Sequence, residues 1–256
     1  MTVAAVLVIY PLVQGRELGW PWWCFAMIAG GLLVFGAFIG YERATGRAPV
    51  IEASLLSNRT FSAGLAVALV FFAAVGGFLF AFGLYVQLGL RFTPLHAGLT
   101  ALPLSVGILL AATASRWLTP RLGRQLLHGG LLIVTLGLVA LAATTAHFRL
   151  SMTTWDVTPA ALITGLGMGL VFGPLFGVIL GAVGDSEVGS ASGTLSAVQQ
   201  LGGALGVAGI TTLYFALAGH THDTTAATTT ALAAAGATII AFGLVFLLPK
   251  QTRSNR

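Results

Sequence analysis

Charged residues divide this chain into seven long uncharged stretches. Each stretch has 24 to 35 residues, most of them apolar. A helix needs about 20 apolar residues to cross the hydrocarbon core of a bilayer, which is about 30 Å thick. The pattern therefore predicts seven full transmembrane helices. We place them near residues 21–40, 61–87, 97–116, 125–146, 158–182, 189–217 and 228–248.

An eighth apolar segment covers residues 2–13, which is about half of the length that a span requires. It does not have the features of a signal peptide, because no basic residues precede it and no small-residue cleavage site follows it. We interpret it as the last part of a helix whose beginning is missing. The expected chain is thus a fragment that starts inside a helix.

The composition excludes a water-soluble globular protein. Of the 256 residues, 57% are hydrophobic and only 7% are charged, whereas soluble domains carry roughly 25% charged residues. The mean hydropathy is +0.95. Cys24 is the single cysteine, so a disulfide scaffold is excluded as well. The predicted fold class is an all-α membrane protein in the cell membrane.

Basic residues alternate between the loops in a way that predicts the orientation. Nine of the twelve fall on one side of the predicted membrane: Arg43, Arg47, Arg59, Arg116, Arg121, Arg124, Lys250, Arg253 and Arg256. The positive-inside rule then places the C-terminus in the cytoplasm. The net charge of +5 forms no continuous basic face, so we expect no nucleic-acid partner. Interfacial tryptophans agree with the spans, since Trp20, Trp22, Trp23, Trp117 and Trp155 all fall near predicted helix ends.

No constellation for catalysis is found. The chain has no phosphate-binding loop and no H-E-x-x-H motif. His220, His222 and Asp223 are metal-ligand types, but they lie in a short threonine-rich loop, for which a solvated loop is favoured over a metal site. The predicted spans contain no Asp, Glu or Lys between their interfaces, so no proton relay can be assigned. We predict that the protein is not an enzyme and holds no cofactor or metal.

Glycines recur on one face of two predicted helices. Small residues at such spacing let a neighbouring backbone approach closely. We therefore predict close helix packing, with a role in rocking motions as the alternative. The residues are Gly165, Gly169, Gly173 and Gly177 with Pro174 in one span, and Gly202, Gly203 and Gly206 in the next. The run Gly165-Leu-Gly167-Met-Gly169 superficially resembles a dinucleotide loop, but it lies inside an apolar span without a preceding strand.

Amides are the strongest polar candidates within the spans. Gln87 lies near the non-cytoplasmic end of its helix, whereas Gln199 and Gln200 lie in mid-span. An unsatisfied amide in hydrocarbon is costly, so these side chains should face other helices or a cavity. For Gln199, interhelical hydrogen bonding and ligand contact remain open. Phe82 and Tyr85 precede Gln87 and are candidates for an aromatic-lined substrate cavity, with lipid contact as the alternative.

Several short motifs occur in an order that resembles one transporter family. They are Gly19-Trp20, Glu42-Arg43, Tyr85-Val86-Gln87, His96-Ala97-Gly98-Leu99, Arg121-Leu122-Gly123-Arg124, Gly165-Leu-Gly167-Met-Gly169 with Gly173-Pro174, Gly189-Ser-Ala-Ser-Gly193 and Gln200-Leu-Gly202-Gly203-Ala-Leu-Gly206. Together they resemble the C-terminal half of a major facilitator superfamily transporter. The branch that they resemble is the fourteen-helix drug:proton antiporters of the EmrB/QacA type.

The resemblance implies a domain organisation. Residues 1–55 would supply one partial and one complete linker helix, and residues 56–256 a six-helix bundle. Pro120, Arg121, Gly123 and Arg124 would lie in the loop between the second and third helices of the bundle, where the family has a conformational latch. Pro120 stands where that motif usually has Asp, which argues against a charge-based latch.

The resemblance also implies a function. Such proteins export small lipophilic, often cationic compounds by proton-coupled alternating access between two bundles. The proton-coupling carboxylates would belong largely to the absent half. The expected partners are the lipid bilayer, a small-molecule substrate, protons, and either an N-terminal half or a second copy of the chain. The alternative is a membrane remnant or scaffold that transports nothing.

Overall fold

The computed structural model describes residues 58–218 and 223–249, together with residues 7, 21–23, 25–27, 29–31, 33, 34 and 55. The chain divides into two compact units, Met1–Glu52 and Ala53–Arg256. In the first unit, the described residues between 22 and 34 are helical. The expected partial helix at 2–13 lies outside the described residues except for Leu7.

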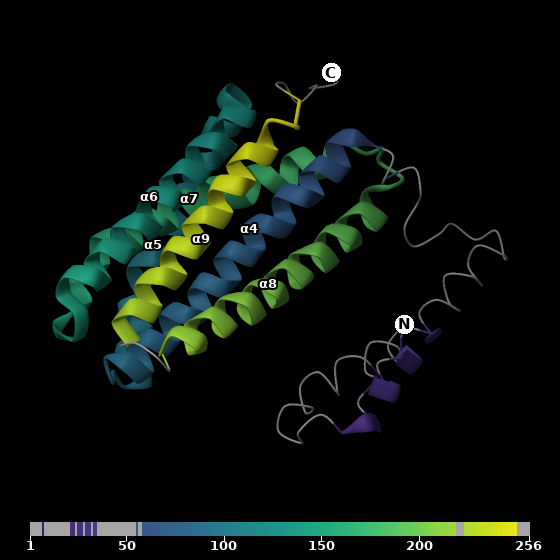
Figure 1. Ribbon diagram of the computed structural model, residues 1–256. Coiled ribbons are helices and arrows are strands. Elements are labelled where there is room, and N and C mark those ends of the chain that lie inside the picture. Colours follow the sequence, from purple (N-terminus) through teal and green to yellow (C-terminus); the bar gives the residue numbers. More distant parts are fainter. Residues whose placement is uncertain are drawn as a thin grey trace. The chain divides into compact units, whose positions relative to one another are not determined.

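The second unit consists of long helices joined by short turns (Figure 1). The helices are α4 (Arg59–Leu84), α5 (Pro94–Leu122), α6 (Arg124–Phe148), α7 (Thr154–Leu180), α8 (Val188–Ala218) and α9 (Asp223–Val245). A π-helical turn, η1 (Tyr85–Gly89), extends α4, and a 3-10 turn, η2 (Arg149–Ser151), follows α6. All six segments are long and apolar enough to cross a membrane. The prediction of an all-α membrane protein is confirmed.

Local sequence explains where the helices begin. The Asn58 side chain accepts hydrogen bonds from the backbone N–H groups of Thr60 and Phe61 and so caps α4. At the start of α7, the Asp156 carboxylate accepts hydrogen bonds from the Thr153 backbone and hydroxyl, at 2.8 and 2.7 Å. The Thr153 side chain in turn accepts from the Asp156 backbone N–H, and the two residues thus form a capping box. It starts α7 four residues before the predicted boundary.

The connection between α5 and α6 corrects one prediction. Pro120 and Arg121 are not in a loop, because α5 continues to Leu122. Gly123 alone separates the two helices, and its φ of 49° and ψ of −124° are accessible to glycine at little cost. Arg124 is the first residue of α6. The sharp turn at Gly123 thus replaces the expected loop.

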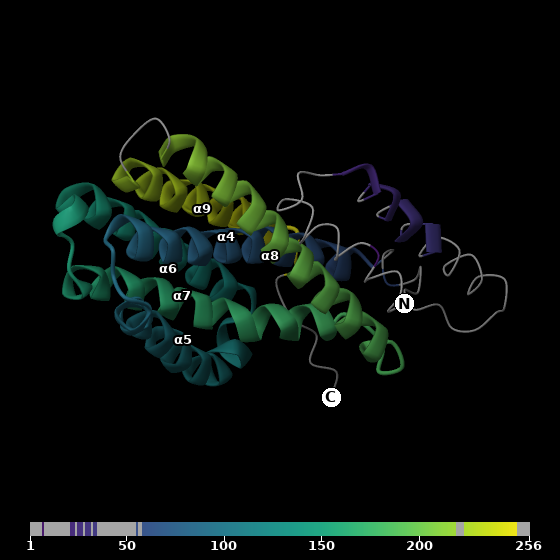
Figure 2. The same cartoon turned by 90° about the horizontal axis from the view of Figure 1, so that it is seen from below.

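The six described helices form two groups of three, and the two groups pack against each other. Helix α4 packs mainly against α8 and α9, while α7 packs mainly against α5 and α6. Contacts between α6 and α9 join the groups. In Figure 2, α5 and α8 lie on opposite sides of the bundle, with α4 and α7 between them. The apolar segments of α5 and α8 are only 22% and 17% buried, against 39% to 56% for the other four.

Glycines lie where the helices cross most closely. Side chains at Gly165 and Gly169 would collide with the carbonyl oxygens of Leu104 and Ile108 in α5. A Cβ atom on Gly107 of α5 would lie 2.5 Å from the Leu162 carbonyl oxygen in α7. The α5–α7 crossing therefore depends on glycine in both helices.

Two hydroxyl pairs link α6 and α9 inside the bundle. The Oγ1 atoms of Thr135 and Thr238 lie 2.7 Å apart, and those of Thr145 and Thr228 lie 3.0 Å apart. The Oγ1 atom of each threonine also lies within hydrogen-bond distance of a carbonyl oxygen of its own helix, so in each pair one hydroxyl can donate to its helix and the other to its partner. Such bonds satisfy the hydroxyls where no water is available.

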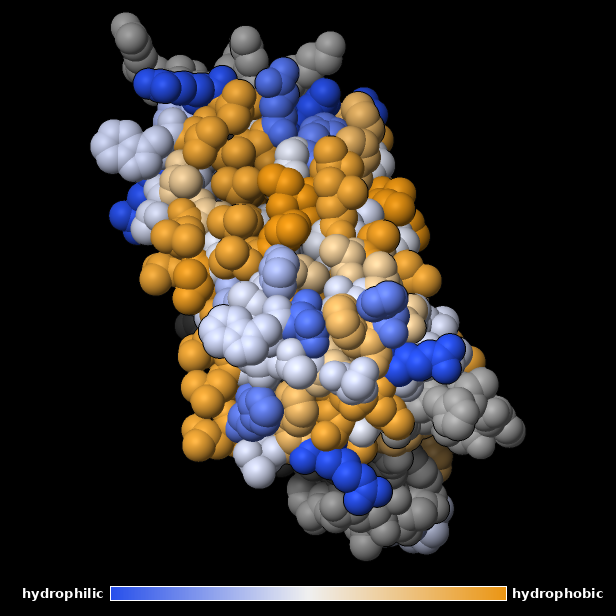
Figure 3. Space-filling view, turned by 90° about the vertical axis from the view of Figure 1, so that its left-hand side faces the viewer, coloured by the Kyte–Doolittle hydropathy of each residue, from blue (hydrophilic) through white to orange (hydrophobic). Residues whose placement is uncertain are grey.

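The outer surface suits a bilayer. Figure 3 shows orange, apolar side chains forming a broad band next to blue side chains at one end of the bundle. Trp117 and Trp155 lie near helix ends and are 80% and 81% exposed, as expected for residues at a membrane interface. The predicted position of Trp20 lies outside the described residues.

Candidate functional site

Helix α8 exposes two flanks of opposite character. Its polar flank consists of Ser192, Ser196, Gln199 and Gln200, which follow the i, i+4, i+7, i+8 spacing of one helix face. Its apolar flank contains Leu201 and Leu205, which are 59% and 61% exposed. A lipid environment suits the second flank and penalises the first. The polar flank is our candidate functional site.

The two amides of the polar flank lack protein partners. Gln199 is half-buried and Gln200 is exposed. Within the described part of the chain, neither side chain forms a hydrogen bond. In contrast, the hydroxyls of Ser192 and Ser196 donate to the carbonyls of Gly189 and Ser192 in their own helix. The amides are therefore the groups of this flank that are available to a ligand, water or a further protein surface.

An aromatic cluster joins α4 and α7. Phe71 and Phe72 of α4 contact Phe172 of α7 with ring centroids 5.5 and 5.6 Å apart. Phe176 of α7 completes the cluster, 6.3 Å from Phe72. Phe72 also reaches α8, since its Cβ would lie 3.2 Å from a Cβ on Gly202. Sequence analysis missed this cluster, although Phe172 and Phe176 have the i, i+4 spacing of one face.

The candidate residues of α4 do not join the polar flank. Tyr85 is fully buried, and its hydroxyl donates to the Arg149 carbonyl at 2.9 Å. Phe82 and Tyr85 line a crevice with only about 10 Å³ of open space, far below the size of a ligand pocket. Gln87 is exposed, and its amide donates to the Gly83 carbonyl at 3.2 Å.

Gln87 is also distant from the amides of α8. Gly76 of α4 lies against Gly203 of α8. Gln87 follows Gly76 by eleven positions and Gln200 precedes Gly203 by three. Because the two helices run in the same direction, the rise of 1.5 Å per residue separates these amides by about 20 Å along the bundle. Gln87 and the amides of α8 therefore cannot belong to one binding site.

The glycines of α8 have different roles. Side chains at Gly202 and Gly206 would collide with the carbonyl oxygens of Leu69 and Ala73 in α4, whereas nothing lies within 4 Å of a Cβ built on Gly203. Partners that sequence analysis missed, Gly76 and Gly77, face them from α4. In α7, the glycines are closely packed only in the first part of the helix. A Cβ atom added to Gly173 would meet one atom, the Ser115 Oγ at 3.4 Å, and a Cβ atom added to Gly177 would meet nothing within 4 Å.

Arg124 is held at the end of α9. Its Nη1 atom donates to the carbonyls of Leu248 at 2.7 Å and Phe246 at 3.3 Å, and its guanidinium lies 5.7 Å from the Phe246 ring centroid. A cation at a helix C-terminus satisfies unpaired carbonyls and suits the helix dipole. Arg124 therefore ties α6 to α9 within this bundle.

The described residues contain no group of three or more His, Cys, Asp or Glu side chains that could hold a metal ion. His220 and His222 lie outside the described residues. No ionisable side chain belongs to the polar flank of α8. What the polar flank offers is amide hydrogen bonding, which can orient a ligand through its polar groups.

Comparison with known proteins assigns the chain to a family. Residues 1–207 match the family model of the Major Facilitator Superfamily. The chain is 42% identical over 246 residues to a probable actinorhodin transporter of Streptomyces coelicolor, covering 93% of this chain and 43% of that protein. It is 30% identical over 218 residues to a puromycin resistance protein of Streptomyces alboniger, covering 81% of this chain and 41% of that protein.

A tetracycline resistance determinant of Streptomyces rimosus is 28% identical over 225 residues, covering 84% of this chain and 63% of that protein. The chain thus spans about half of the length of these relatives. Their names and the family model indicate a transporter and not an enzyme. The chain belongs to the Major Facilitator Superfamily of membrane transporters.

Proposed function

We propose that this chain forms part of an exporter of small lipophilic, often cationic compounds, and that Gln199 and Gln200 of α8 contact the substrate. The observation that carries the proposal is the pair of amides without partners on an open helix at membrane depth. Burying such groups against lipid would be costly. The half-buried Phe172 and Phe176 of α7 are the aromatic side chains that we propose for contact with a lipophilic cation.

The substrate class rests on the relatives. Their names refer to actinorhodin, puromycin and tetracycline. For this chain we propose an organic molecule of that kind, exported by alternating access around a site near the middle of the membrane.

We further propose that a second six-helix bundle completes the transporter. The low burial of α5 and α8 supports this, since each of these helices packs mainly against one neighbour, α7 and α4 respectively, and exposes the rest of its surface. Residues 56–256 would then be the C-terminal bundle of a fourteen-helix drug antiporter, with residues 1–55 as linker helices. The other bundle would be an N-terminal half or a second copy. It would also bear the carboxylates for proton coupling, because the polar flank of α8 has none.

The proposed setting is the cell membrane, with the C-terminus in the cytoplasm. The end of α5, with Arg116 and Arg121, and the start of α6, with Arg124, would face the same side as the C-terminus. Clusters of basic residues favour the cytoplasmic side of a membrane.

Reconstitution tests the proposal. The chain alone, in liposomes with a proton gradient, should not pump a fluorescent lipophilic cation. The chain co-expressed with the part of the Streptomyces coelicolor relative that it does not match should pump it. Export by the chain alone would refute the need for a second bundle. Background export in both samples, with both proteins folded, would favour a remnant or scaffold that transports nothing.

A further inference from the structure

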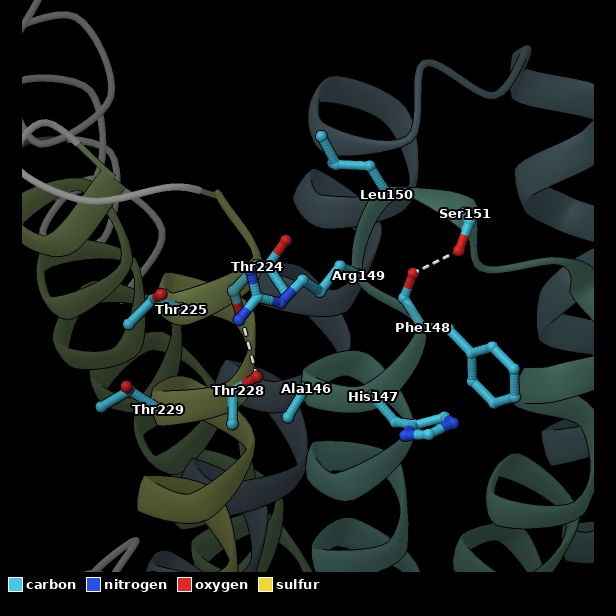
Figure 4. Close-up of a pocket in the computed structure, with 10 residues that line it drawn as sticks. All are labelled: Ala146, His147, Phe148, Arg149, Leu150, Ser151, Thr224, Thr225, Thr228 and Thr229. Carbon is cyan, nitrogen blue, oxygen red and sulfur yellow. Dashed lines mark hydrogen bonds between the residues drawn. The ribbon is translucent and has the colours of Figure 1, made fainter.

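A cavity of about 710 Å³ with a mixed polar and apolar lining lies between the end of α6 and the start of α9 (Figure 4). Arg149 and Ser151 line it from η2, and Thr224, Thr225, Thr228 and Thr229 line it from the first two turns of α9. It shares no residue with the polar flank of α8. Its volume falls within the range of ligand pockets, which is about 300–1,000 Å³.

Arg149 supplies the charge of this cavity. In Figure 4, its side chain extends from the end of α6 toward α9. No ion pair neutralises the Arg149 guanidinium among the residues that the structure describes, and no carboxylate is among the described residues that line the cavity. An unpaired cation in a cavity favours an anionic ligand.

The backbone of Arg149 is held in an uncommon conformation. Its φ is 50° and its ψ is −126°, a conformation that costs about 1–3 kcal/mol for a residue other than glycine. The buried Tyr85 hydroxyl donates to the Arg149 carbonyl at 2.9 Å. Such conformations persist only where surrounding contacts hold them. Tyr85 therefore anchors the backbone from which the arginine enters the cavity.

Two further hydroxyl groups line the cavity from α9. The Thr228 hydroxyl is occupied, because it donates to the Thr224 carbonyl and contacts Thr145. The hydroxyls of Thr225 and Thr229, one turn apart, form no hydrogen bond within the described ranges. They lie at the start of α9, where the helix dipole favours negative charge. One guanidinium and two hydroxyls at such a helix end form a set of donors suited to a phosphate group.

The cavity lies at the level of the lipid headgroups. It is at the end of the bundle where α7 begins, and Trp155 in the first turn of α7 is 81% exposed. We propose that this cavity binds the phosphate of an anionic lipid, with Arg149 as the main contact and Thr225 and Thr229 as hydroxyl donors. The inference is independent of the proposed export function.

Lipid titration of the purified full chain tests this site. After delipidation in detergent, native mass spectrometry should detect tighter binding of phosphatidylglycerol than of zwitterionic phosphatidylcholine. Arg149→Gln should weaken phosphatidylglycerol binding about tenfold, because it removes a charged donor. Arg91→Gln is the matched control, since Arg91 is also exposed, has a positive φ of 56° and does not line the cavity.

A second variant and a competitor complete the test. Thr229→Val leaves Arg149 in place and should weaken binding about threefold, through the loss of one hydroxyl donor. Inorganic phosphate at millimolar concentration should not displace the lipid; displacement would make a soluble phosphate the ligand of the site. Equal losses in Arg149→Gln and Arg91→Gln, or no loss in Arg149→Gln and Thr229→Val, would overturn the proposal.

Discussion

Replacing Gly206 with alanine should destabilise the bundle by about 3 kcal/mol, the upper part of the range for overpacked cores. A Cβ atom at this position would collide with the Ala73 carbonyl oxygen of α4. That oxygen belongs to a helix backbone and cannot rotate away as a side chain could. The two helices must separate instead, which also disturbs the contacts of the buried Phe72. Unfolding of the purified chain in mixed micelles, followed by circular dichroism, measures the change.

Gly203 offers the matched control three residues earlier in the same helix. Nothing lies within 4 Å of a Cβ built there. Gly203→Ala should therefore leave stability unchanged or raise it by up to about 1 kcal/mol, because alanine is the better helix former. Equal destabilisation by the two substitutions would contradict the packing register of α4 and α8.

Gln199→Leu should reduce export by the completed transporter about tenfold, which is the loss expected when one polar contact with a ligand is removed. Leucine keeps the size of the side chain but cannot form hydrogen bonds. Since no protein group in the described part of the chain bonds to Gln199, folding should be unaffected. Efflux from vesicles that contain the chain and a complementary bundle measures the effect.

Two further variants make this result specific. Gln199→Asn retains the amide and should recover part of the export. Leu205→Ala alters the apolar flank of the same helix and should leave export close to that of the unaltered protein. Loss of export in Leu205→Ala to the same degree would indicate that α8 as a whole is sensitive, and would count against a contact at Gln199.

Much of the fold was predictable because charge and membrane thickness determine it. The uncharged stretches located the six long helices that the structure describes in the second unit. The predicted helix ends were less accurate, because local capping determines where a helix begins. The prediction began α7 after the charged Asp156, whereas the Thr153–Asp156 capping box places this residue inside the first turn. The π-helical turn at Tyr85–Gly89 has no comparable pattern in the sequence.

The candidate site was only partly predictable. Tyr85 and Gln87 were grouped because they are close in sequence, but residues two positions apart do not share a helix face, and the structure buries one and exposes the other. Gly202, Gly203 and Gly206 look equivalent in sequence. Only the register between α4 and α8 shows that Gly203 has space for a side chain. The contact of α4 and α7 through Phe72 and Phe172 depends on tertiary structure in the same way.

The polar flank of α8 should face a water-filled pathway, while the apolar flank of the same helix should face lipid. The most direct measurement compares Gln200→Cys with Leu201→Cys in a Cys24→Ser background of the completed transporter. These neighbours lie at the same depth, about 100° apart around the helix. A membrane-impermeant thiol reagent should label Cys at 200 at least about ten times faster than Cys at 201, since thiolate chemistry requires water. Equal labelling rates, or faster labelling at 201, would contradict the account.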